Sequence, residues 1–431
     1  MKERRVAITT LGCKTNQFES AAIQENLLKE GFSVVPFDAE ADVYVINTCT
    51  VTARTDAESR RLIRRARRRS PGARIVVTGC YAQVAPDIVN AFDEVALVVG
   101  NEEKKRLAAL LKEEQPERVH VADIGLLRKA EALPLETFAE HTRAFLQVQN
   151  GCDSFCSYCI VPFARGRSRS VAPDAVMSGV SRFVRQGFRE VVLTGIHLGA
   201  YGRDLEPACC LLDLLEMMQA NRVTSRLRLG SLEPLDITPG LIAFLCTSPM
   251  VCHHLHIPLQ SGSDRVLSLM NRGYTGDYFR GLVMKLVDGI PDVAIGLDVI
   301  AGFPGETDED FLATCRLIEE LPIAYLHVFP FSSRPGTAAA TMAGHLHAHS
   351  VTERAARLRH LGEAKKRAYH EGFLGAELDV LVMQQGDDGL WNGISRNYIP
   401  VAFAGTDSMA NTEIRLRITD VTGDRLIGII C

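Results

Sequence analysis

The sequence predicts an α/β protein with an N-terminal parallel α/β sheet domain, a central partial (β/α) barrel and a small C-terminal antiparallel β-barrel of the OB-like kind. Three observations support this fold class. Apolar strands alternate with helical patterns in the first part of the chain, six further strands alternate with helices in the central region, and short strands separated by turns follow Gly372. We place the domains at 1–115, 141–370 and 371–431, with a linker over 116–140.

The composition excludes several classes of protein. Of the 431 residues, 46% are apolar and 23% are charged, which is typical of a globular chain and not of a disordered one. No apolar run reaches the length of about 18 residues that a transmembrane helix needs, and the N-terminus carries no signal-peptide pattern. We therefore expect a cytoplasmic protein. A net charge of −4 leaves nucleic-acid binding open, because a local basic patch is enough for it.

The N-terminal domain is predicted from four strands of the buried type. They are expected at Val6–Thr10, Val43–Ile46, Ile75–Thr78 and Val95–Val99. A helix is expected over Phe18–Lys29, with Asn16 and Glu19 as a capping box at its start. Strands that alternate with helices in this way form a parallel sheet.

Three of the twelve cysteines directly follow strands of this sheet. Cys13, Cys49 and Cys80 each lie just past the carboxyl end of a predicted strand. Because these ends share one edge of a parallel sheet, the three thiols should converge where such sheets bind ligands. Disulfides are rare in the cytosol, so this many cysteines indicates metal binding, catalysis or burial. Three buried structural cysteines are the alternative.

The central and C-terminal regions contain the remaining predicted strands. Those of the central barrel are Ala144–Val148, Glu190–Leu193, Arg226–Leu229, His254–Ile257, Ala294–Ile300 and Tyr325–Val328. A basic helix is expected over Arg354–His370. The strands of the C-terminal barrel are Glu377–Met383, Tyr398–Phe403, Glu413–Ile418 and Arg425–Ile430.

The most specific motif lies between Gly151 and Cys159, where Cys152, Cys156 and Cys159 have the spacing C-x3-C-x2-C. Three such thiolates can hold three irons of a [4Fe–4S] cube and leave the fourth iron without a protein ligand. That iron can chelate the amino and carboxylate groups of S-adenosylmethionine (SAM), whose reduction gives a 5′-deoxyadenosyl radical. A structural zinc site is the alternative, but it needs four protein ligands, and no fourth Cys or His is present in this loop.

The order of these motifs resembles the radical SAM methylthiotransferases over essentially the whole chain. In that family a three-cysteine domain, a C-x3-C-x2-C barrel and a terminal TRAM domain follow one another. The stretches that carry the resemblance are Asn47-Thr-Cys-Thr-Val-Thr52, Thr78-Gly-Cys-Tyr-Ala-Gln83, Thr194-Gly-Ile-His-Leu-Gly199, Pro258-Leu-Gln-Ser-Gly-Ser263 and Gly302-Phe-Pro-Gly-Glu306. They are most similar to the branch that acts on N6-threonylcarbamoyladenosine at position 37 of tRNA.

The resemblance implies an enzyme with two [4Fe–4S] clusters and SAM as cofactors. Its catalytic cysteines would be metal ligands in two trios, Cys152, Cys156 and Cys159 for one cluster and Cys13, Cys49 and Cys80 for the other. One SAM would donate a methyl group to sulfur held at the second cluster, and another would supply the radical that removes the hydrogen from carbon 2 of adenine. A radical suits this step because an unactivated aromatic C–H bond is not acidic enough for a side-chain base.

Polar residues at predicted strand ends are candidates for SAM binding, because they would face the mouth of the barrel. They are Thr194, Ser231, Glu233, Gln260 and Ser261. Tyr158 resembles a family aromatic residue whose backbone lies near the adenine of SAM, and Gly302 permits close approach of the backbone to a ligand. Core packing, helix capping and a plain turn are the alternatives.

Three histidines close in sequence, His253, His254 and His256, suggest a metal site. His254 and His256 alternate along a predicted strand with apolar partners. Packing inside the barrel is therefore the favoured interpretation.

Two groups of residues are candidates for RNA binding. Nine arginines and two acids fall between Arg54 and Arg74, largely on a predicted helix, and a solvated face normally mixes the two signs. The arginines expected to contact phosphates are Arg60, Arg61, Arg64, Arg65 and Arg68. Around a predicted turn of the C-terminal domain, the residues expected to stack on or hydrogen-bond to bases are Trp391, Arg396, Asn397 and Tyr398. Simple turn chemistry is the alternative there.

The partners implied are the anticodon stem-loop of tRNA and an electron donor such as flavodoxin or ferredoxin, with no membrane and with a monomer favoured. The nearest alternative function is that of a sister methylthiotransferase, which acts on isopentenyladenosine at position 37 of tRNA or on an aspartate of a ribosomal protein. A noncatalytic iron–sulfur protein that binds RNA is the alternative from another class.

Overall fold

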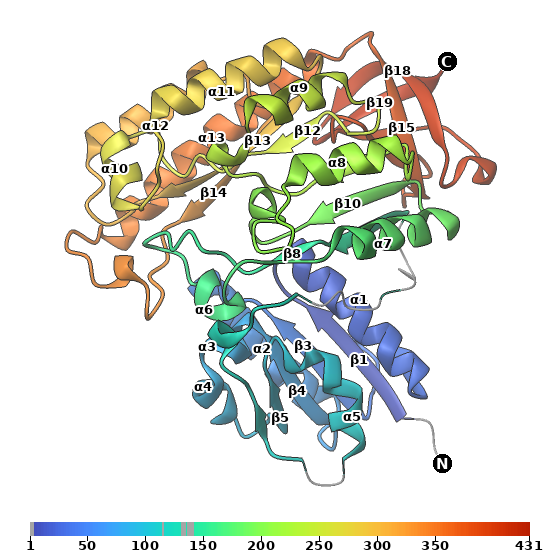
Figure 1. The fold of residues 1–431 in the computed structure, drawn as a ribbon, viewed down its shortest axis with the longest axis vertical. Coiled ribbons are helices and arrows are strands. Elements are labelled where there is room, and N and C mark those ends of the chain that lie inside the picture. The colour runs from blue at the N-terminus through green and yellow to red at the C-terminus, as the bar shows by residue number, and fades with distance from the viewer. Residues whose placement is uncertain (1–3, 114–115, 131–134, 136–141) are drawn as a thin grey trace. The chain divides into compact units, whose positions relative to one another are not determined.

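The computed structural model describes residues 4–113, 116–130, 135 and 142–431, and its fold is the α/β class predicted (Figure 1). The predicted linker over 116–140 lies partly outside the described residues. The chain forms two compact units. The first consists of Met1–Ala139, Gln147–Ala172 and Ser332–Ala340, and the second of Glu140–Leu146, Pro173–Phe331 and Thr341–Cys431. Both cysteine trios therefore belong to the first unit.

The first unit is built on a parallel sheet of six strands in the order β2-β1-β3-β4-β5-β6. The strands are β1 (Arg4–Thr10), β2 (Phe32–Val35), β3 (Val43–Thr48), β4 (Arg74–Gly79), β5 (Leu97–Val99) and β6 (Val119–His120). The helices between them are α1 (Lys14–Lys29), α2 (Ala53–Arg69), α3 (Cys80–Val84), α4 (Pro86–Asn90) and α5 (Leu107–Lys112). The edge strands β2 and β6 were not predicted, because each is short and only partly buried.

Helices cover both faces of this sheet, because successive strand residues point to opposite sides. Tyr44 and Ile46 of β3 belong to one apolar core, which includes Leu62 of α2. Val45, on the opposite face of the same strand, belongs to a second core with Leu27 of α1. Burial on both faces explains why β3 reads as a continuous apolar run.

The first helix differs from the prediction at its start. α1 begins at Lys14 with Cys13 as its N-cap, so Asn16 and Glu19 lie inside the helix. The expected capping box is therefore wrong. Both side chains are buried and bond to groups outside the helix, as described below.

The second unit contains a partial barrel. One sheet has the order β11-β10-β7 and the other β12-β13-β14, and the bridges Leu227↔Val251 and Ser231↔His256 lie between them. The strands are β7 (Arg143–Gln147), β10 (Glu190–Thr194), β11 (Leu227–Leu229), β12 (His254–His256), β13 (Ala294–Ala301) and β14 (Tyr325–Pro330). The helices are α7 (Pro173–Arg185), α8 (Leu211–Ala220), α9 (Pro239–Thr247), α10 (Asp264–Leu269), α11 (Gly276–Gly289), α12 (Asp308–Glu320) and α13 (Ala348–Glu371).

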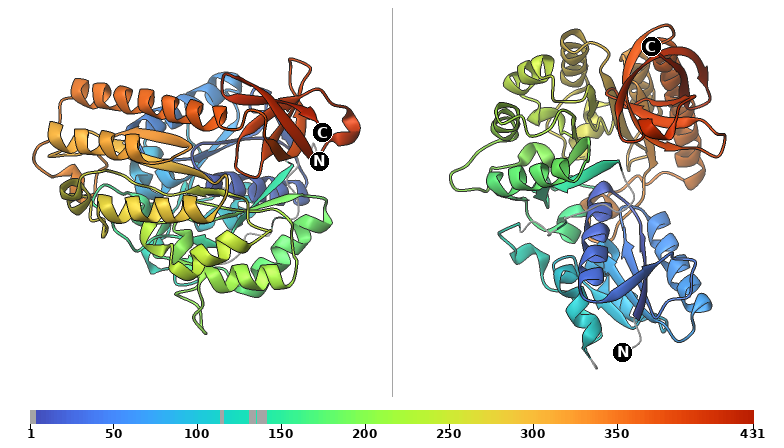
Figure 2. Two further views of the ribbon diagram at one scale, coloured as in Figure 1. Left: turned by 90° about the horizontal axis from the view of Figure 1, so that it is seen from above. Right: turned by 90° about the vertical axis from the view of Figure 1, so that its right-hand side faces the viewer.

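A closed five-stranded barrel ends the chain and follows α13 directly (Figure 2). Its strands in barrel order are β15 (Glu377–Gln385), β16 (Trp391–Ser395), β17 (Pro400–Phe403), β19 (Arg425–Ile430) and β18 (Glu413–Thr422). Trp391 is the first residue of β16, so the prediction that it lies around a turn is wrong. The core of this barrel includes Val380, Phe403 and Leu416.

No helix within the described residues combines the length and the apolar character needed to cross a bilayer.

Candidate iron–sulfur centres and substrate surfaces

Cys13, Cys49 and Cys80 meet at the carboxyl edge of the N-terminal sheet. Cys13 follows β1, Cys49 follows β3 and Cys80 follows β4, and these three strands are neighbours in the sheet. A Cβ atom at Gly12, the residue before Cys13, would lie only 2.8 Å from Cys49 Sγ. The turn that holds Cys13 is thus packed directly against the Cys49 thiol.

Two glycines allow the strand ends to approach one another. Gly12 and Gly79, the residues before Cys13 and Cys80, have φ values of 97° and 96°. A Cβ at Gly79 would lie 2.3 Å from the carbonyl oxygen of Thr48. A larger residue at either place would be strained and would push the cysteine loops apart.

The electrostatics of this trio fit a metal group. Burial raises the pKa of the Cys49 thiol, and the neighbouring Cys80 and Cys13 raise it further, to about 12. Three thiolates so close together repel one another unless a cation lies between them. Metal binding supplies that cation and displaces the thiol protons.

A buried charged network lies beside the same trio. The Glu19 carboxylate accepts hydrogen bonds from both Lys104 and Arg165, and all three side chains are at most 3% exposed. Arg165 also donates to Asn16 Oδ1, and the Asn16 amide donates to the carbonyl of Thr48 at 3.0 Å. Two cations therefore surround one carboxylate, which leaves one positive charge in excess.

That excess charge is directed toward the cysteines. Burial lowers the pKa of Arg165, but the charges of Cys80 and Glu19, with a smaller part from Cys13, raise it well above its ordinary value. Among the described residues, the buried atoms Arg165 Nε, Asn47 Oδ1 and Thr78 Oγ1 have no hydrogen-bond partner. Buried polar groups are rarely left unpaired in proteins. The donor set, the excess charge and these unpaired atoms fit an anionic thiolate-bound cluster.

The second trio lies on a loop between β8 (Gln149–Asn150) and α6 (Val161–Arg165). The Cys159 amide donates to the Cys156 carbonyl at 2.9 Å, and the Cys152 amide donates to Gly166 at 3.1 Å. The Ser154 amide lies 3.5 Å from Cys152 Sγ, a contact that favours the thiolate. The loop is thus folded so that three thiols can serve one cluster.

Arg165 links the two trios within the first unit. It ends α6, directly after the Cys152–Cys159 loop, and its guanidinium bonds to Glu19 and Asn16 on the helix that follows Cys13. Sequence reasoning did not identify this role of Arg165 or of Lys104. Their partner Glu19 lies far away along the chain, so no local pattern connects them.

The segment Ser332–Ala340 also contacts both cysteine regions. Arg334 donates to Thr50 Oγ1 at 2.8 Å and pairs with Asp56 at the start of α2. The Ala339 amide donates to the carbonyl of Ser157, inside the loop of the second trio, at 2.7 Å.

The residues predicted to bind SAM are divided between the units. Tyr158 lies in the first unit, and the others lie in the second. Thr194 ends β10 and is 2% exposed, and its hydroxyl has no hydrogen-bond partner in the described part of the chain. The Thr194 hydroxyl is therefore a buried polar group whose hydrogen bond a bound ligand would supply.

The other candidates in the second unit have structural contacts. Glu233 pairs with Arg272, and the Ser261 hydroxyl lies 3.3 Å from Thr314 Oγ1 of α12. Gln260 has a φ of 64°, and its backbone amide donates to the Asp298 carbonyl. A Cβ at Gly302 would lie 2.7 Å from the Val351 side chain. Ser231 belongs to the group described next.

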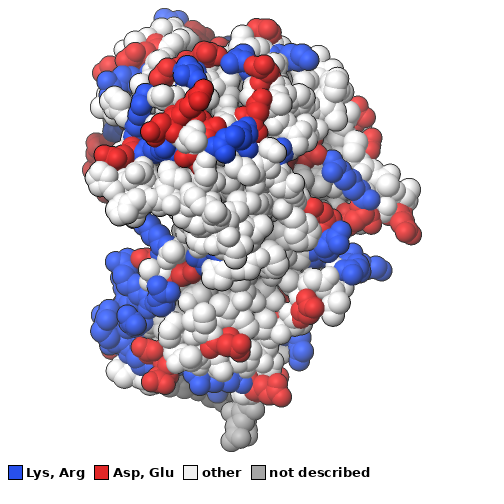
Figure 3. All heavy atoms as spheres, turned by 90° about the vertical axis from the view of Figure 1, so that its left-hand side faces the viewer, with Lys and Arg blue, Asp and Glu red and all other residues white. Residues whose placement is uncertain are grey.

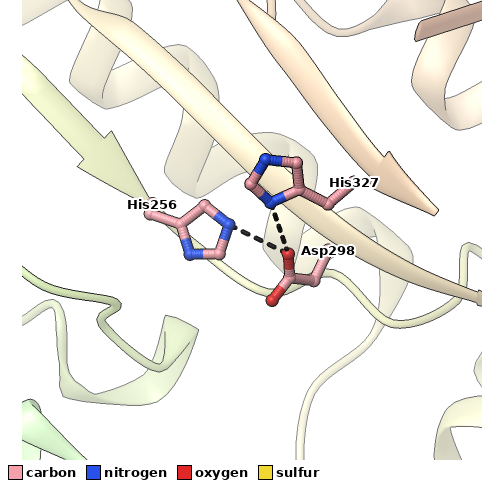
Figure 4. A group of neighbouring side chains, drawn as sticks. All are labelled: His256, Asp298 and His327. Atoms are coloured by element: carbon pink, nitrogen blue, oxygen red, sulfur yellow. Dashed lines mark hydrogen bonds and ion pairs between the residues drawn. The ribbon is translucent and has the colours of Figure 1, made fainter. Parts of the chain in front are cut away.

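His256, Asp298 and His327 form a group on three neighbouring strands (Figure 4). His256 Nε2 lies 3.0 Å and His327 Nδ1 3.2 Å from Asp298 Oδ1. Burial raises the pKa of Asp298, but the hydrogen bonds from the two histidines outweigh it and lower the pKa to about 2. The Ser231 hydroxyl lies 2.8 Å from His256 Nδ1.

The sequence interpretation covered only part of this group. His254 is buried and bonds to the Tyr325 hydroxyl at 2.8 Å, as a packed histidine does. His256 instead points toward Asp298 and His327, which were not predicted as site residues. Strand periodicity could have identified them, because Asp298 and His327 are direct partners in the β13–β14 register.

The exposed arginines of α2 form a basic surface. Leu62, Ile63 and Ala66 face the core, whereas the exposed arginines are Arg54, Arg61, Arg64, Arg65, Arg68 and Arg69. Figure 3 shows a dense group of basic side chains on the N-terminal sheet domain, to which α2 belongs. Arg60 is half-buried, with its guanidinium 3.4 Å from the Tyr81 hydroxyl.

Arg61 pairs with Glu58 and Arg65 with Asp38, whereas Arg64 and Arg68 have no acidic partner among the described residues. A hollow of about 400 Å³ is lined by Phe37, Asp38, Arg65, Arg68 and Arg69.

The predicted RNA contacts of the C-terminal barrel are used in packing. Trp391 is 6% and Asn397 3% exposed, and Arg396 pairs with Glu413. The Tyr398 ring lies 4.8 Å below the Arg228 guanidinium. We therefore leave these four residues out of the RNA surface proposed below.

A buried ion-pair group joins this barrel to the strands of the same unit. The Glu190 carboxylate accepts hydrogen bonds from Arg226 and Arg228, and all three side chains are at most 1% exposed. The two guanidiniums also donate to backbone carbonyls of Ile394, Ser395 and Arg396.

Comparison with known proteins agrees with this geometry. Residues 5–100 match the "Uncharacterized protein family UPF0004", and residues 146–318 match the radical SAM superfamily. The fold is similar to that of the radical SAM methyltransferase TsrM from Kitasatospora setae, with a TM-score of 0.60 and 16% identity over 78% of this chain and 77% of that one.

The chain also matches curated relatives over nearly its whole length. It is 38% identical to the threonylcarbamoyladenosine tRNA methylthiotransferase MtaB of Bacillus subtilis over 96% of this chain and 93% of the relative. It is 38% identical to MtaB of Aquifex aeolicus over 93% and 97%. It is 35% identical to the tRNA-2-methylthio-N(6)-dimethylallyladenosine synthase of Moorella thermoacetica over 96% and 95%. By its motifs, its fold and these relatives, the chain belongs to the radical SAM methylthiotransferase family, whose members use SAM and [4Fe–4S] clusters.

Proposed function

We propose that this chain transfers a methylthio group to carbon 2 of N6-threonylcarbamoyladenosine at position 37 of tRNA. The observation that carries the proposal is the presence of two three-cysteine sites in one compact unit, each suited to a cluster with one iron free of protein ligands. When bound, the clusters and SAM supply the electron, the radical and the sulfur that this substitution requires. The similarity to MtaB proteins supports the choice of nucleoside.

The residues of the chain have distinct tasks in this proposal. Cys152, Cys156 and Cys159 hold the cluster that binds SAM, with Thr194 as a candidate for a SAM contact. Cys13, Cys49 and Cys80 hold the cluster that carries the sulfur. The excess positive charge of the Glu19 network lowers the cost of burying the negative charge of the three thiolates.

The tRNA contact is proposed on α2. Arg64 and Arg68 are exposed and without an acidic partner in the described part of the chain, so their charge is available to phosphates of the anticodon stem-loop. The reaction consumes electrons one at a time, so a flavodoxin or a ferredoxin is the proposed donor. We propose that the protein acts as a monomer.

The test is methylthiolation by anaerobically reconstituted protein. The chain is incubated with SAM, dithionite, a sulfur source and tRNA that carries threonylcarbamoyladenosine, and the nucleosides are separated by mass spectrometry. We expect the 2-methylthio nucleoside, together with 5′-deoxyadenosine. The variant Cys156→Ala is the control and should give neither product.

A second candidate substrate is isopentenyladenosine, because a relative at 35% identity is named tRNA-2-methylthio-N(6)-dimethylallyladenosine synthase, and dimethylallyl is another name for the isopentenyl group. The same assay with isopentenyladenosine tRNA separates the two. If only the isopentenyladenosine tRNA gives a methylthio product, then isopentenyladenosine is the substrate and our assignment is wrong. A reconstituted protein that forms no 5′-deoxyadenosine would instead support the noncatalytic iron–sulfur protein.

A further inference from the structure

The β12-β13-β14 sheet of the second unit has one polar face. On β13, Leu297 and Val299 are fully buried, whereas Asp298 between them is partly exposed. On β14, Leu326 packs against α13, since a Cβ at Gly362 would lie 2.9 Å from Leu326 Cβ. Because strand residues alternate, Asp298 and His327 project from the face opposite α13.

The polar group on this face is hydrogen-bonded within itself. Ser231 bonds to His256, and both histidines bond to the same oxygen of Asp298. No hydrogen bond within the described residues uses Asp298 Oδ2 or His327 Nε2, and the His327 side chain is 56% exposed (Figure 4). One carboxylate oxygen of Asp298 and one ring nitrogen of His327 thus have no hydrogen-bond partner among the described residues, and a ligand could bond to them.

Aromatic packing holds the two histidines in place. The Tyr325 ring lies 6.2 Å from the His256 ring and 5.1 Å from the His327 ring, measured between centroids. Gly296 makes room for this ring, because a Cβ there would lie 2.0 Å from Tyr325 Cζ. The group is therefore preorganised before any ligand arrives.

We propose that Asp298 and His327, positioned by His256, bind the polar substituent on N6 of the substrate adenine, an inference that rests on the proposed function. A threonylcarbamoyl group has urea N–H donors, a hydroxyl and a carboxylate, so it offers partners to both free atoms. An isopentenyl group has none and would leave a carboxylate and an imidazole desolvated without a hydrogen bond. The group thus selects for the polar nucleoside.

The experiment compares two tRNAs with matched variants of the full-length, reconstituted protein. His327→Phe keeps an aromatic ring without nitrogen atoms, and Asp298→Asn removes the charge. His349→Phe is the control, because His349 is exposed on α13 and its ring pairs with the exposed Glu353. The measurements are kcat/KM for tRNA with threonylcarbamoyladenosine or isopentenyladenosine at position 37, and 5′-deoxyadenosine formed without tRNA.

We expect each of the two variants to lower kcat/KM for the threonylcarbamoyl tRNA about tenfold or more, mainly through KM. SAM cleavage without tRNA and any activity on the isopentenyl tRNA should be unchanged, as should all activities of His349→Phe. A kcat/KM within about twofold of the wild type in both variants overturns the inference.

A bound non-iron metal ion that His327→Phe removes also overturns the inference, because the three side chains would then serve that ion. If the wild type itself leaves threonylcarbamoyl tRNA unmodified, the proposed function fails, which is a different result.

Discussion

One buried group beside Cys13 and Cys80 holds both signs of charge. The Glu19 carboxylate is negative, and Lys104 and Arg165 are positive. Water cannot screen these charges, so each acts strongly on a cluster held by the nearby thiolates. Reduction adds a negative charge to such a cluster. Cations beside it favour the reduced form, and a carboxylate disfavours it.

This reasoning predicts shifts of opposite sign in the reduction potential of the cluster on the first trio. Arg165→Gln and Lys104→Gln should lower the midpoint potential, and Glu19→Gln should raise it, because the first two remove a positive charge and the third removes a negative one. Potentials are measured by redox titration with electron paramagnetic resonance, in protein whose other cluster is removed by Cys156→Ala.

Arg61→Gln is the control, because Arg61 is exposed on α2 and should have no effect. Shifts of the same sign in all three variants would indicate structural damage and contradict the electrostatic role.

The positions of the six cysteines could be predicted from strand ends and spacing, whereas the residues around them could not. Asn16 and Glu19 match the spacing of a capping box, yet both are buried and bond to distant partners. Arg165 reaches Glu19 across 146 positions of sequence. Such a contact depends on how two loops are packed, which no local pattern records.

At the scale of elements, α2 separates an apolar side from a basic side. We expect the double variant Arg64→Glu and Arg68→Glu to weaken tRNA binding at least tenfold, because it replaces two phosphate-binding cations by anions. The slope of log affinity against log salt should become shallower by about 2 for the same reason. Filter binding or fluorescence anisotropy at several salt concentrations measures both.

A matched control for α2 is the double variant Arg359→Glu and Arg367→Glu, two positions that are exposed on α13. It changes the net charge in the same direction but should leave the affinity near that of the wild type. Equal losses in the two proteins would show that net charge, and not the surface of α2, controls binding.

The Glu190 ion-pair group predicts a large effect on the stability of the second unit. Glu190→Gln leaves Arg228 buried without a carboxylate and removes one of the two carboxylates that pair with Arg226, the other being Glu413, which should cost about 3 kcal/mol or more. The single tryptophan, Trp391, lies in the adjoining barrel, so its fluorescence can follow denaturation by urea. Arg415→Ala is the control, since its pair with Asp379 is exposed to solvent and should contribute little to stability.

The same group has a defined pH dependence. Burial raises the pKa of Glu190, but Arg228 and Arg226 outweigh it and lower the pKa to about 2 in the folded chain, against an ordinary value of 4.5. Its contribution to stability is therefore complete above pH 4.5 and is lost as the pH falls toward 2. Glu190→Gln should lack this part of the pH profile of urea denaturation; an unchanged profile would contradict the assignment.

Most elements were predictable from periodicity, and the exceptions have physical reasons. β16 contains Asn392-Gly393, a pair that is typical of a hairpin turn. In the barrel, Gly393 instead lies under Val380, where a Cβ would come within 2.4 Å of the valine methyl group. The glycine is needed for close strand packing, and the sequence alone does not distinguish the two uses.

At the scale of the whole molecule, the two trios should be separable in function. The triple variant Cys13→Ala, Cys49→Ala and Cys80→Ala should keep about half of the iron and should still cleave SAM, because the other trio is intact. It should form no methylthio nucleoside. Iron and sulfide analysis, chromatography of 5′-deoxyadenosine and nucleoside mass spectrometry test the three parts, and loss of SAM cleavage with the remaining cluster in place would contradict separate roles.

The Arg165 link and the segment Ser332–Ala340 also bear on how the protein is made. The sheet of the first unit is complete once residue 120 has left the ribosome, but Arg165 is synthesised later and Arg334 later still. Domains generally fold as units while the chain grows. Here the nascent N-terminal sheet must wait, with its thiols and the Glu19 carboxylate only partly enclosed, until most of the polypeptide has been translated. The cluster is therefore expected to be fully enclosed only after these later residues have emerged, and a ribosome-stalled chain ending before residue 160 should hold iron at Cys13 less stably than the full chain does.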